Sequence, residues 1–316
     1  MDKDLANRLN KRFKLLEKWA NRQSISCFRI YERDLPDFPF ILDWIDSDLI
    51  CWLYDRSKDE KDEQKENYKN LVIKTIQHVF PNLKERIFLK YRRKKQGLTD
   101  QYQKLGKTNC VKTVQEGPLH FEVNLSDYLD IGLFLDHRRT RDYVQLLAKD
   151  KYVLNLFAYT GSFTCYAAYG GAKSTTTVDL NANYIEWAKR NLKLNKLAND
   201  KKHFFYTENC FQFLKKTISK RNYDLIICDP PTFSNSKKMK DTFNINDDYP
   251  KLIKDCLNIL SKKGILLFSS NSQKLQLNTA QLPSSISCQE MSFKTRSEDF
   301  KGKKGHRCWE IKRLEG

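Results

Sequence analysis

Short apolar runs alternate with amphipathic stretches over the last two thirds of this 316-residue chain, and this constrains the fold most. The strands are expected at 119–123, 151–157, 174–180, 203–207, 223–228 and 264–270, the helices at 142–149, 162–169, 183–195, 209–219 and 248–260, and a final antiparallel pair near 287–294 and 307–314. Strands that alternate with helices at this spacing predict a parallel, doubly wound sheet. The fold class is therefore α/β.

The first third of the chain has a different pattern. An amphipathic basic helix is expected over 3–21, three short strands near 25–32, 38–45 and 48–54, a helix over 68–80 and a strand over 86–92. We therefore expect two domains: a smaller N-terminal α+β region over residues 1–110, and an α/β domain over 111–316.

The chain is strongly basic, with 57 Lys and Arg against 39 Asp and Glu and a net charge of +18. Such an excess favours an anionic partner, for which nucleic acid is the default. The densest charge lies between Lys84 and Lys107 and is interleaved with tyrosines, as in RNA grooves that hold phosphates and stack bases. The alternative is a solvated surface loop. We therefore expect residues 1–110 to be the RNA-binding region. The RNA-binding residues expected there are Arg92, Arg93, Lys94, Lys95, Tyr102 and Lys104.

The nine cysteines are dispersed and include no C-x-x-C pair, so neither a disulfide framework nor a metal site is expected. The first residues are charged, with no apolar leader, and no stretch reaches about 20 apolar residues. These observations predict a cytoplasmic protein without a membrane partner.

Asp229-Pro230-Pro231-Thr232-Phe233 follows an apolar run that predicts a buried strand. Two prolines after a central strand stop sheet pairing and stiffen the exit of the chain. They leave an acid and a ring at the carboxyl end of the sheet, where open α/β folds bind ligands. This suits a flat base held beside a cofactor; the alternative is a proline-rich turn.

Further polar residues follow the neighbouring strands. Gly161 lies in the turn after the strand at 151–157, Asp179 lies at the end of the strand at 174–180, and Asn209 follows the strand at 203–207. An acid at the position of Asp179 accepts ribose hydroxyls in Rossmann-like folds, and Asn209 is a candidate acceptor for an adenine amine. The turn lacks the G-x-G-x-x-G pattern, which disfavours a dinucleotide. Singly, each Asp or Asn could instead be a helix N-cap.

Three segments, NLFAYTGSF (155–163), TTTVDLNANYIEWAKRN (175–191) and DPPTFSNSKKM (229–239), resemble class I S-adenosylmethionine-dependent methyltransferases. With VNLSDYLDIGLFLDHRRTR (123–141) and QYQKLGK (101–107), the chain resembles the RlmK-type guanine-N7 methyltransferases of bacterial 23S rRNA. The resemblance implies a Rossmann-like class I methyltransferase domain, S-adenosyl-L-methionine as cofactor, and 23S rRNA or its precursor as partner.

The resemblance also implies roles for residues. Phe157, Ala158 and Gly161 would line the methionine part of the cofactor, Asp179 would hold the ribose and Asn209 the adenine, where many relatives have Asp. Asp136 and Arg138 are candidates for the two ends of the methionine; the alternative is a structural ion pair. His137 is a candidate base or a structural imidazole. The expected cofactor set is Phe134, Asp136, Arg138, Asn155, Phe157, Ala158, Thr160, Gly161, Asp179, Asn209 and Asp229.

The target-base side would be formed by Asp229, Pro230, Pro231 and Phe233, with Asn235 and Lys237 contacting the RNA. Methylation of a pyrimidine C5 needs a cysteine nucleophile, and the loops after the strands at 223–228 and 264–270 contain none. Guanine N7 carries its own lone pair, so positioning is the main requirement. The alternatives are methylation of an exocyclic amine such as guanine N2, and a non-catalytic RNA-binding assembly factor.

Fusion proteins of this family place an RNA-binding THUMP domain and an RlmL-type N2-guanine methyltransferase before the RlmK part. The sequence begins at Met1 with neither. We therefore expect a stand-alone enzyme or an isolated half, with an RlmL-type partner in trans as an open alternative.

Overall fold

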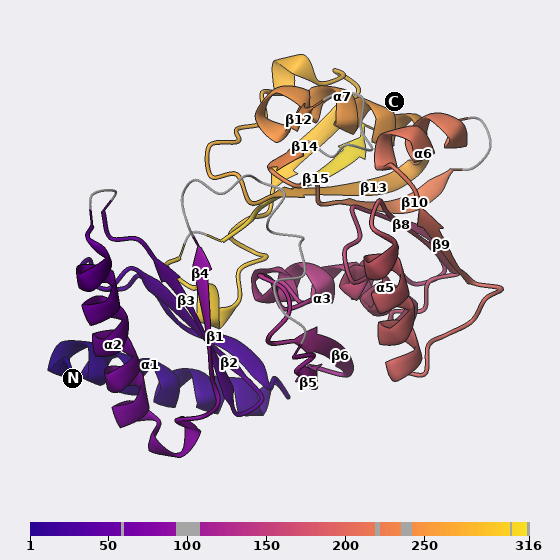
Figure 1. Ribbon diagram of the computed structural model, residues 1–316. Helices are drawn as coiled ribbons and strands as arrows, with labels where there is room; N and C mark the ends of the chain where they lie inside the picture. The colour runs from indigo at the N-terminus through magenta and orange to yellow at the C-terminus, as the bar shows by residue number, and fades with distance from the viewer. Residues whose placement is uncertain (58–59, 93–107, 219–221, 235–241, 304, 315–316) are drawn as a thin grey trace. The chain divides into compact units, whose positions relative to one another are not determined.

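The computed structural model describes residues 1–57, 60–92, 108–218, 222–234, 242–303 and 305–314. It contains two compact units, Met1–Ile131 with Glu298–Lys303, and Gly132–Ser297 with Lys304–Gly316 (Figure 1). Each unit has its own sheet and its own hydrophobic core. Among the described residues, no helix is both long and apolar enough to cross a bilayer.

The first unit is built on a four-stranded sheet in the order β1-β2-β3-β4. Strands β1 (Cys27–Glu32), β2 (Phe40–Ile45) and β3 (Asp48–Tyr54) form an antiparallel meander, and β4 (Ile87–Arg92) pairs parallel to β3. A parallel neighbour requires a crossover, which α2 (Asp62–Val79) and the short helix η1 (Pro81–Leu83) supply. The meander and the β4 strand were both predicted from the sequence.

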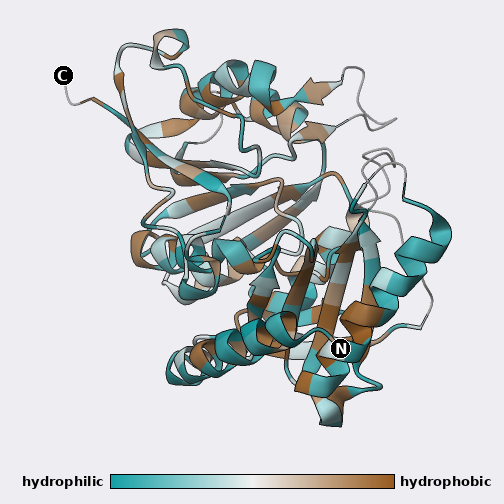
Figure 2. Ribbon diagram, turned by 90° about the vertical axis from the view of Figure 1, so that its left-hand side faces the viewer, coloured by the Kyte–Doolittle hydropathy of each residue, from teal (hydrophilic) through white to brown (hydrophobic). Residues whose placement is uncertain are grey.

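Helix α1 (Lys3–Arg22) packs through one apolar stripe on the β1–β3 sheet. Leu5, Leu9 and Leu16 lie at helical spacing and share a buried cluster with Phe28 and Leu42. Asp2 caps the helix by accepting a hydrogen bond from the Leu5 N–H at 2.8 Å. Figure 2 shows the resulting pattern, with hydrophobic colour concentrated on the strands and alternating along the helices.

A hairpin of β5 (Val111–Glu116) and β6 (Leu119–Asn124) completes the first unit. The sequence placed the domain division after residue 110, whereas the compact units divide after Ile131. Backbone and side-chain bonds account for the difference: the Ser26 N–H donates to Gln115 O at 2.9 Å, and the Trp52 indole donates to Leu129 O at 3.3 Å.

The second unit has a seven-stranded sheet in the order β14-β15-β13-β10-β7-β8-β9. Its parallel strands are β7 (Tyr152–Leu156), β8 (Ser174–Asp179), β9 (His203–Thr207), β10 (Tyr223–Cys228) and β13 (Leu260–Ser270). The last pair, β14 (Ile286–Glu290) and β15 (Arg307–Arg313), runs antiparallel at one edge. The predicted class, an α/β fold with a doubly wound parallel sheet, is confirmed.

Helices cover both faces of this sheet (Figure 1). One face packs against α3 (Arg138–Leu147) and α4 (Ser162–Tyr169), and the other against α6 (Cys210–Thr217) and α7 (Ile245–Asn258). The two cores use alternate residues of β10, with Leu225 and Ile227 on one side and Ile226 and Cys228 on the other. Helix α5 (Ala182–Leu194) lies beside α4 and strands β8 and β9.

Several element boundaries differ from the sequence-based expectation. Helix α2 begins at Asp62 rather than residue 68, because its first turn is charged and exposed. Helix α3 begins at Arg138 rather than residue 142, and here the charged residues Arg138 and Arg141 are themselves buried. Strand β5 and the two-residue strands β11 (Phe233–Ser234) and β12 (Phe243–Asn244) were not predicted, since they are short or lack a clear apolar alternation.

The glycine after β7 is required by both conformation and packing. Gly161 has φ 73°, and a Cβ on it would lie 2.5 Å from the Ala188 Cβ of α5. The close approach at Gly161 is therefore to a neighbouring helix. Gly171 has a similar φ of 83°, but its Cβ would meet nothing closer than 3.9 Å.

We expect Gly161→Ala to lower the free energy of unfolding by more than Gly171→Ala. Both substitutions strain the backbone, at a cost of about 1–3 kcal/mol, but only Gly161→Ala adds a steric clash, worth roughly a further 1–3 kcal/mol. Urea denaturation followed by circular dichroism measures the two differences. Equal destabilisation would contradict the close α4–α5 packing.

Candidate functional site

The centre of the larger sheet contains a topological switch point. Strand β7 pairs on one side with β8 and on the other with β10, and the chain runs outward from β7 to β9 but from β10 to β13. Connections that leave neighbouring strands in opposite directions open a crevice at the carboxyl ends, where such folds bind ligands. The segments after β7, β8 and β10 therefore define the candidate site.

The turn between β7 and α4 has a strained backbone. Phe157 and Tyr159 have φ values of 55° and 51°, in the left-handed region that bulky residues seldom adopt. Their N–H groups are nevertheless satisfied, since Phe157 donates to the Cys210 sulfur at 3.2 Å and Tyr159 donates to Asp179 at 2.9 Å. Backbone strain of this kind clusters at functional sites.

Asp179 ends β8 and holds two turns at once. Its Oδ2 accepts the Tyr159 N–H and its Oδ1 accepts the Asn181 N–H, both at 2.9 Å. Burial raises the pKa of this carboxyl to about 6, although the backbone N–H donors act in the opposite direction. A carboxylate offers about four acceptor positions, so Asp179 retains capacity for further donors such as ribose hydroxyls.

Asn209 has a structural role that the sequence analysis had named as the alternative. Its side-chain oxygen caps α6 by accepting the N–H groups of Phe211 and Gln212 at 2.9 and 3.2 Å. The oxygen that was expected to accept from an adenine amine is therefore engaged by the helix. The group left to Asn209 for a ligand is its amide N–H₂, which is a donor.

The Asp229 corner is held from three sides. The Ser269 hydroxyl donates to Asp229 Oδ1 at 2.6 Å, and His137 Nε2 lies 3.4 Å from Asp229 Oδ2. Pro230 is buried, and Phe233 pairs with Asn244 in the short β11–β12 ladder. Burial raises the pKa of Asp229 to about 6, against the stabilising effect of the Ser269 hydroxyl. These contacts hold the corner at both ends, and the rigidity expected from the two prolines stays a prediction.

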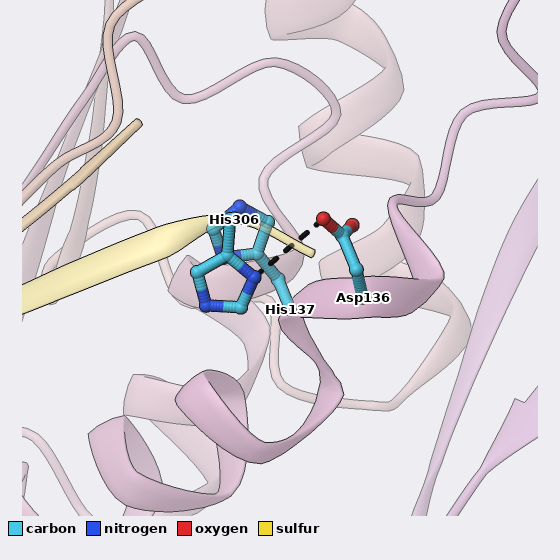
Figure 3. Close-up of side chains that lie close together, drawn as sticks. All are labelled: Asp136, His137 and His306. Carbon is cyan, nitrogen blue, oxygen red and sulfur yellow. Dashed lines mark ion pairs between the residues drawn. The ribbon is translucent and has the colours of Figure 1, made fainter. Parts of the chain in front are cut away.

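The segment before α3 brings further charged groups to Asp229. Asp136 and His137 lie in the short helix η3 (Leu135–His137), and the His137 ring stacks on that of His306 from the other end of the unit (Figure 3). Arg138 is only 3 % exposed and donates to the Ser297 hydroxyl at 3.4 Å. The proposed roles of Asp136 and Arg138 toward a methionine group therefore rest on one partly exposed carboxylate and one deeply buried guanidinium.

Three other expected cofactor residues also make structural contacts. The Asn155 amide is buried between the sheet and α4 and donates to the Thr164 hydroxyl at 3.0 Å. Thr160 is buried and donates to Gly132 O at 2.5 Å. Phe134 lies nearer the turn after β7, with its ring centroid 5.0 Å from that of Tyr159. Their roles toward the cofactor stay predictions.

Most of the expected RNA-binding residues lie outside the described part of the chain: Arg93, Lys94, Lys95, Tyr102, Lys104, Asn235 and Lys237. Arg92, at the end of β4, is described. Its guanidinium is partly exposed and forms an ion pair with Asp130 at 2.6 Å.

Sequence reasoning missed three residues that surround Asp229, namely Arg141, Ser269 and His306. The position of Ser269 could have been predicted. Cys228 pairs with Phe268 in parallel strands, so the residues that follow them, Asp229 and Ser269, lie at the same sheet edge. No sequence pattern indicates that Arg141 and His306 lie near Asp229. A hydrophobicity pattern assigns charged and polar residues to the surface, although these two are buried.

Comparison with known proteins identifies the family. Residues 27–286 match the family model for S-adenosylmethionine-dependent methyltransferases. The ribosomal RNA large subunit methyltransferase K of Neisseria meningitidis serogroup B is 43% identical over 308 residues, which cover 97% of this chain and 86% of that protein. The chain belongs to the family of ribosomal RNA large subunit methyltransferases K. The RlmK-type resemblance is thereby confirmed, and S-adenosylmethionine is the cofactor.

Other relatives differ in length or are more distant. The ribosomal RNA large subunit methyltransferase K/L of Hahella chejuensis is 41% identical over 97% of the chain, which spans only 42% of that protein. Among solved structures, SMU.776 in complex with SAH has a TM-score of 0.75 at 22% identity, covering 97% of this chain and 81% of that one. A methyltransferase from Agrobacterium tumefaciens has a TM-score of 0.62 at 16% identity, covering 92% and 91%. These structures share the fold.

The charges at the switch point fit the cofactor of this family. S-adenosylmethionine carries a cationic sulfonium and an ammonium group, and the crevice presents Asp136, Asp179 and Asp229 near the strand ends. Burial raises the pKa values of Asp179 and Asp229 to about 6, so a cation beside them would favour their charged forms. Asp179 would hold the ribose, while the turn at Phe157–Gly161 would approach the methionine part.

We expect Asp179→Ala to weaken S-adenosylmethionine binding at least tenfold, or about 1.4 kcal/mol, because the ribose loses its acceptor and the turn after β7 loses a tether. Asp179→Asn, which keeps one acceptor oxygen, should lose less. Isothermal titration calorimetry measures both affinities. Asp200→Ala, at an exposed loop position of the same unit, is the matched control. An unchanged affinity for Asp179→Ala would exclude Asp179 from the cofactor site.

Proposed function

We propose that this chain methylates N7 of a guanine in 23S rRNA, with S-adenosylmethionine as methyl donor. The observation that carries the proposal is the Asp229–Phe233 corner, which holds a carboxylate and a ring rigidly at the switch point beside the cofactor region. The printed names of the relatives, ribosomal RNA large subunit methyltransferases K and K/L, support an RNA substrate. The net charge of +18 suits such a polyanion.

The residues of the corner suit a base that is already nucleophilic. Cys228, the cysteine next to the corner, is fully buried and burial raises its pKa well above the ordinary value, so it is no candidate for a covalent step on a pyrimidine. S-adenosylmethionine supplies an electrophilic methyl group when bound. Guanine N7 offers a lone pair in the ring plane and requires no deprotonation, so the protein need only orient and desolvate the base.

Within this proposal, Phe233 and Asp229 have different roles toward the target base. Phe233 stacks on the guanine, and the Asp229 carboxylate accepts hydrogen bonds from the N–H donors of the base. The Ser269 hydroxyl and His137 keep the carboxylate in place. N7 lies in the deep groove of A-form RNA, so the base must leave its helix before it can enter the crevice.

Two alternatives remain as outcomes of the test. Methylation of the exocyclic N2 amine would use Asp229 as a proton acceptor. A non-catalytic assembly factor would bind RNA without turnover.

Nucleoside analysis decides among the three. We expect that incubation of the protein with S-adenosylmethionine and unmodified 23S rRNA transcript yields 7-methylguanosine, detected by mass spectrometry after digestion of the RNA. Asp179→Ala, which lacks the ribose acceptor, is the control with weakened cofactor binding and should yield less methylated nucleoside. N2-methylguanosine in place of 7-methylguanosine would overturn the N7 assignment, and the absence of any methylated nucleoside would favour the assembly factor.

A further inference from the structure

Two buried imidazoles, His137 and His306, stack face to face beside the Asp136 carboxylate (Figure 3). The ring centroids of His137 and His306 are 3.8 Å apart with planes inclined by 21°, and the residues are 1 % and 3 % exposed. His306 Nδ1 lies 3.5 Å from Asp136 Oδ2, while His137 Nε2 lies 3.4 Å from Asp229 Oδ2. The stack therefore connects the segment before α3 to the Asp229 corner.

The arrangement is unsuited to a metal ion, although Asp136, His137 and His306 offer ligand atoms within 4.8 Å of one another. The lone pair of an imidazole nitrogen lies in the plane of its ring. Two nearly parallel rings stacked at 3.8 Å direct their lone pairs along separate planes, so both cannot point at one ion. The geometry instead favours ring packing combined with hydrogen bonding at the ring edges.

His306 is fixed from both of its nitrogens. An ionised carboxylate can only accept, so the Asp136 oxygen 3.5 Å from Nδ1 favours the tautomer with the proton on Nδ1. In that tautomer Nε2 accepts from the Thr140 hydroxyl, whose oxygen is 3.0 Å away. Burial and the neighbouring His137 lower the pKa of His306, which favours the neutral ring. A ring held in this way is a rigid surface for the second imidazole.

His137 is held between rings and faces the carboxylate of the corner. The face of the imidazole packs on His306, and Phe163 of α4 contacts it edge-on at 5.5 Å between centroids. These contacts hold Nε2 at 3.4 Å from Asp229 Oδ2, a charge contact whose geometry is not that of a hydrogen bond in this structure, while the Ser269 hydroxyl donates to the other oxygen of that carboxylate. Both oxygens of Asp229 therefore have a neighbour from the protein side.

We propose that His137 is a positioning residue for Asp229, and that His306 holds His137 in place by stacking. The inference rests on the proposed function, in which Asp229 receives the target base. His137 touches neither the base nor the cofactor in this account. It acts by presenting Nε2–H beside the carboxylate, where a small rotation of either side chain turns the 3.4 Å contact into a hydrogen bond and sets the direction in which Asp229 accepts.

The proposal predicts a pH signature because the donor favours the ionised carboxyl. The charged and titratable groups that face Asp229 come from η3, α3 and β15 with the segment before it: Asp136, His137, Arg141, His306 and Cys308. Asp229 must be ionised to accept from the base, so turnover should rise as the pH increases through about 6. Loss of the His137 donor raises the pKa of Asp229 further and moves this limb to higher pH.

The test compares two substitutions of one residue. His137→Phe keeps a ring against His306 but removes the N–H, whereas His137→Gln places an amide N–H near the position of Nε2. We expect His137→Phe to lower kcat roughly tenfold at unchanged S-adenosylmethionine affinity and to raise the titration midpoint of Asp229 by roughly one unit. His137→Gln should restore most of both. The Asp229 midpoint is read by ¹³C-carboxyl NMR, assigned with Asp229→Asn.

The matched control is His203→Gln. His203 is a buried histidine of the same unit, 2.9 Å from the Thr175 hydroxyl, but it lies in β9 at the far edge of the sheet. The His203→Gln substitution should leave the titration midpoint of Asp229 unchanged. Identical midpoints in wild type, His137→Phe and His137→Gln would overturn the proposal.

Two further readouts keep the inference testable on its own. ¹⁵N NMR of the unmodified protein should show His137 protonated at Nε2, and protonation at Nδ1 alone would overturn the proposal without any variant. The NMR midpoints require no RNA, so a protein that makes no 7-methylguanosine yet shows the shifted midpoint would contradict the proposed function while supporting the positioning role.

Discussion

The parallel pairing of β7 with β10 is the constraint on which the site depends. The register from Leu225–Val153 to Cys228–Leu156 ends both strands at the same sheet edge, so Phe157 and Asp229 emerge side by side. Because the connections then leave in opposite directions, no crossover covers this edge. A shift of register would move the acid, the strained turn and the two prolines out of alignment together.

Charge burial around this edge explains why polar side chains are so closely organised there. Desolvation raises the pKa values of Asp179 and Asp229 to about 6, and a buried carboxylate without donors would be costly. The backbone N–H groups of Tyr159 and Asn181 donate to the first, and the Ser269 hydroxyl donates to the second, whose other oxygen lies 3.4 Å from His137 Nε2. The negative charge of these two carboxylates suits a cationic cofactor, whose positive groups would offset that charge when bound.

Much of this organisation could be predicted from the sequence, because it depends on patterns that run along the chain. The alternation of strands and helices predicted the sheet, and the prolines predicted that the strand ends before Asp229, as β10 does at Cys228. Asp136 and His137 were identified as candidate site residues by the resemblance to the family and not by the hydrophobic pattern. What the sequence did not reveal depends on contacts across long separations, such as the His137–His306 stack and the Ser269 bond to Asp229. Asn209 shows another limit of the sequence: its side-chain oxygen caps a helix, and its role toward the cofactor stays a prediction.

The central claim is that the Asp229–Phe233 corner faces the target base rather than the cofactor. Comparison of Phe233→Ala with Phe233→Tyr tests it most directly, by measuring kcat on RNA beside the dissociation constant for S-adenosylmethionine. Stacking on a base is worth about 1–3 kcal/mol, so Phe233→Ala should lose turnover by roughly 5- to 150-fold with cofactor affinity unchanged, while Phe233→Tyr keeps its activity. Equal losses of turnover and cofactor affinity in Phe233→Ala would place the corner in the cofactor site and contradict the account.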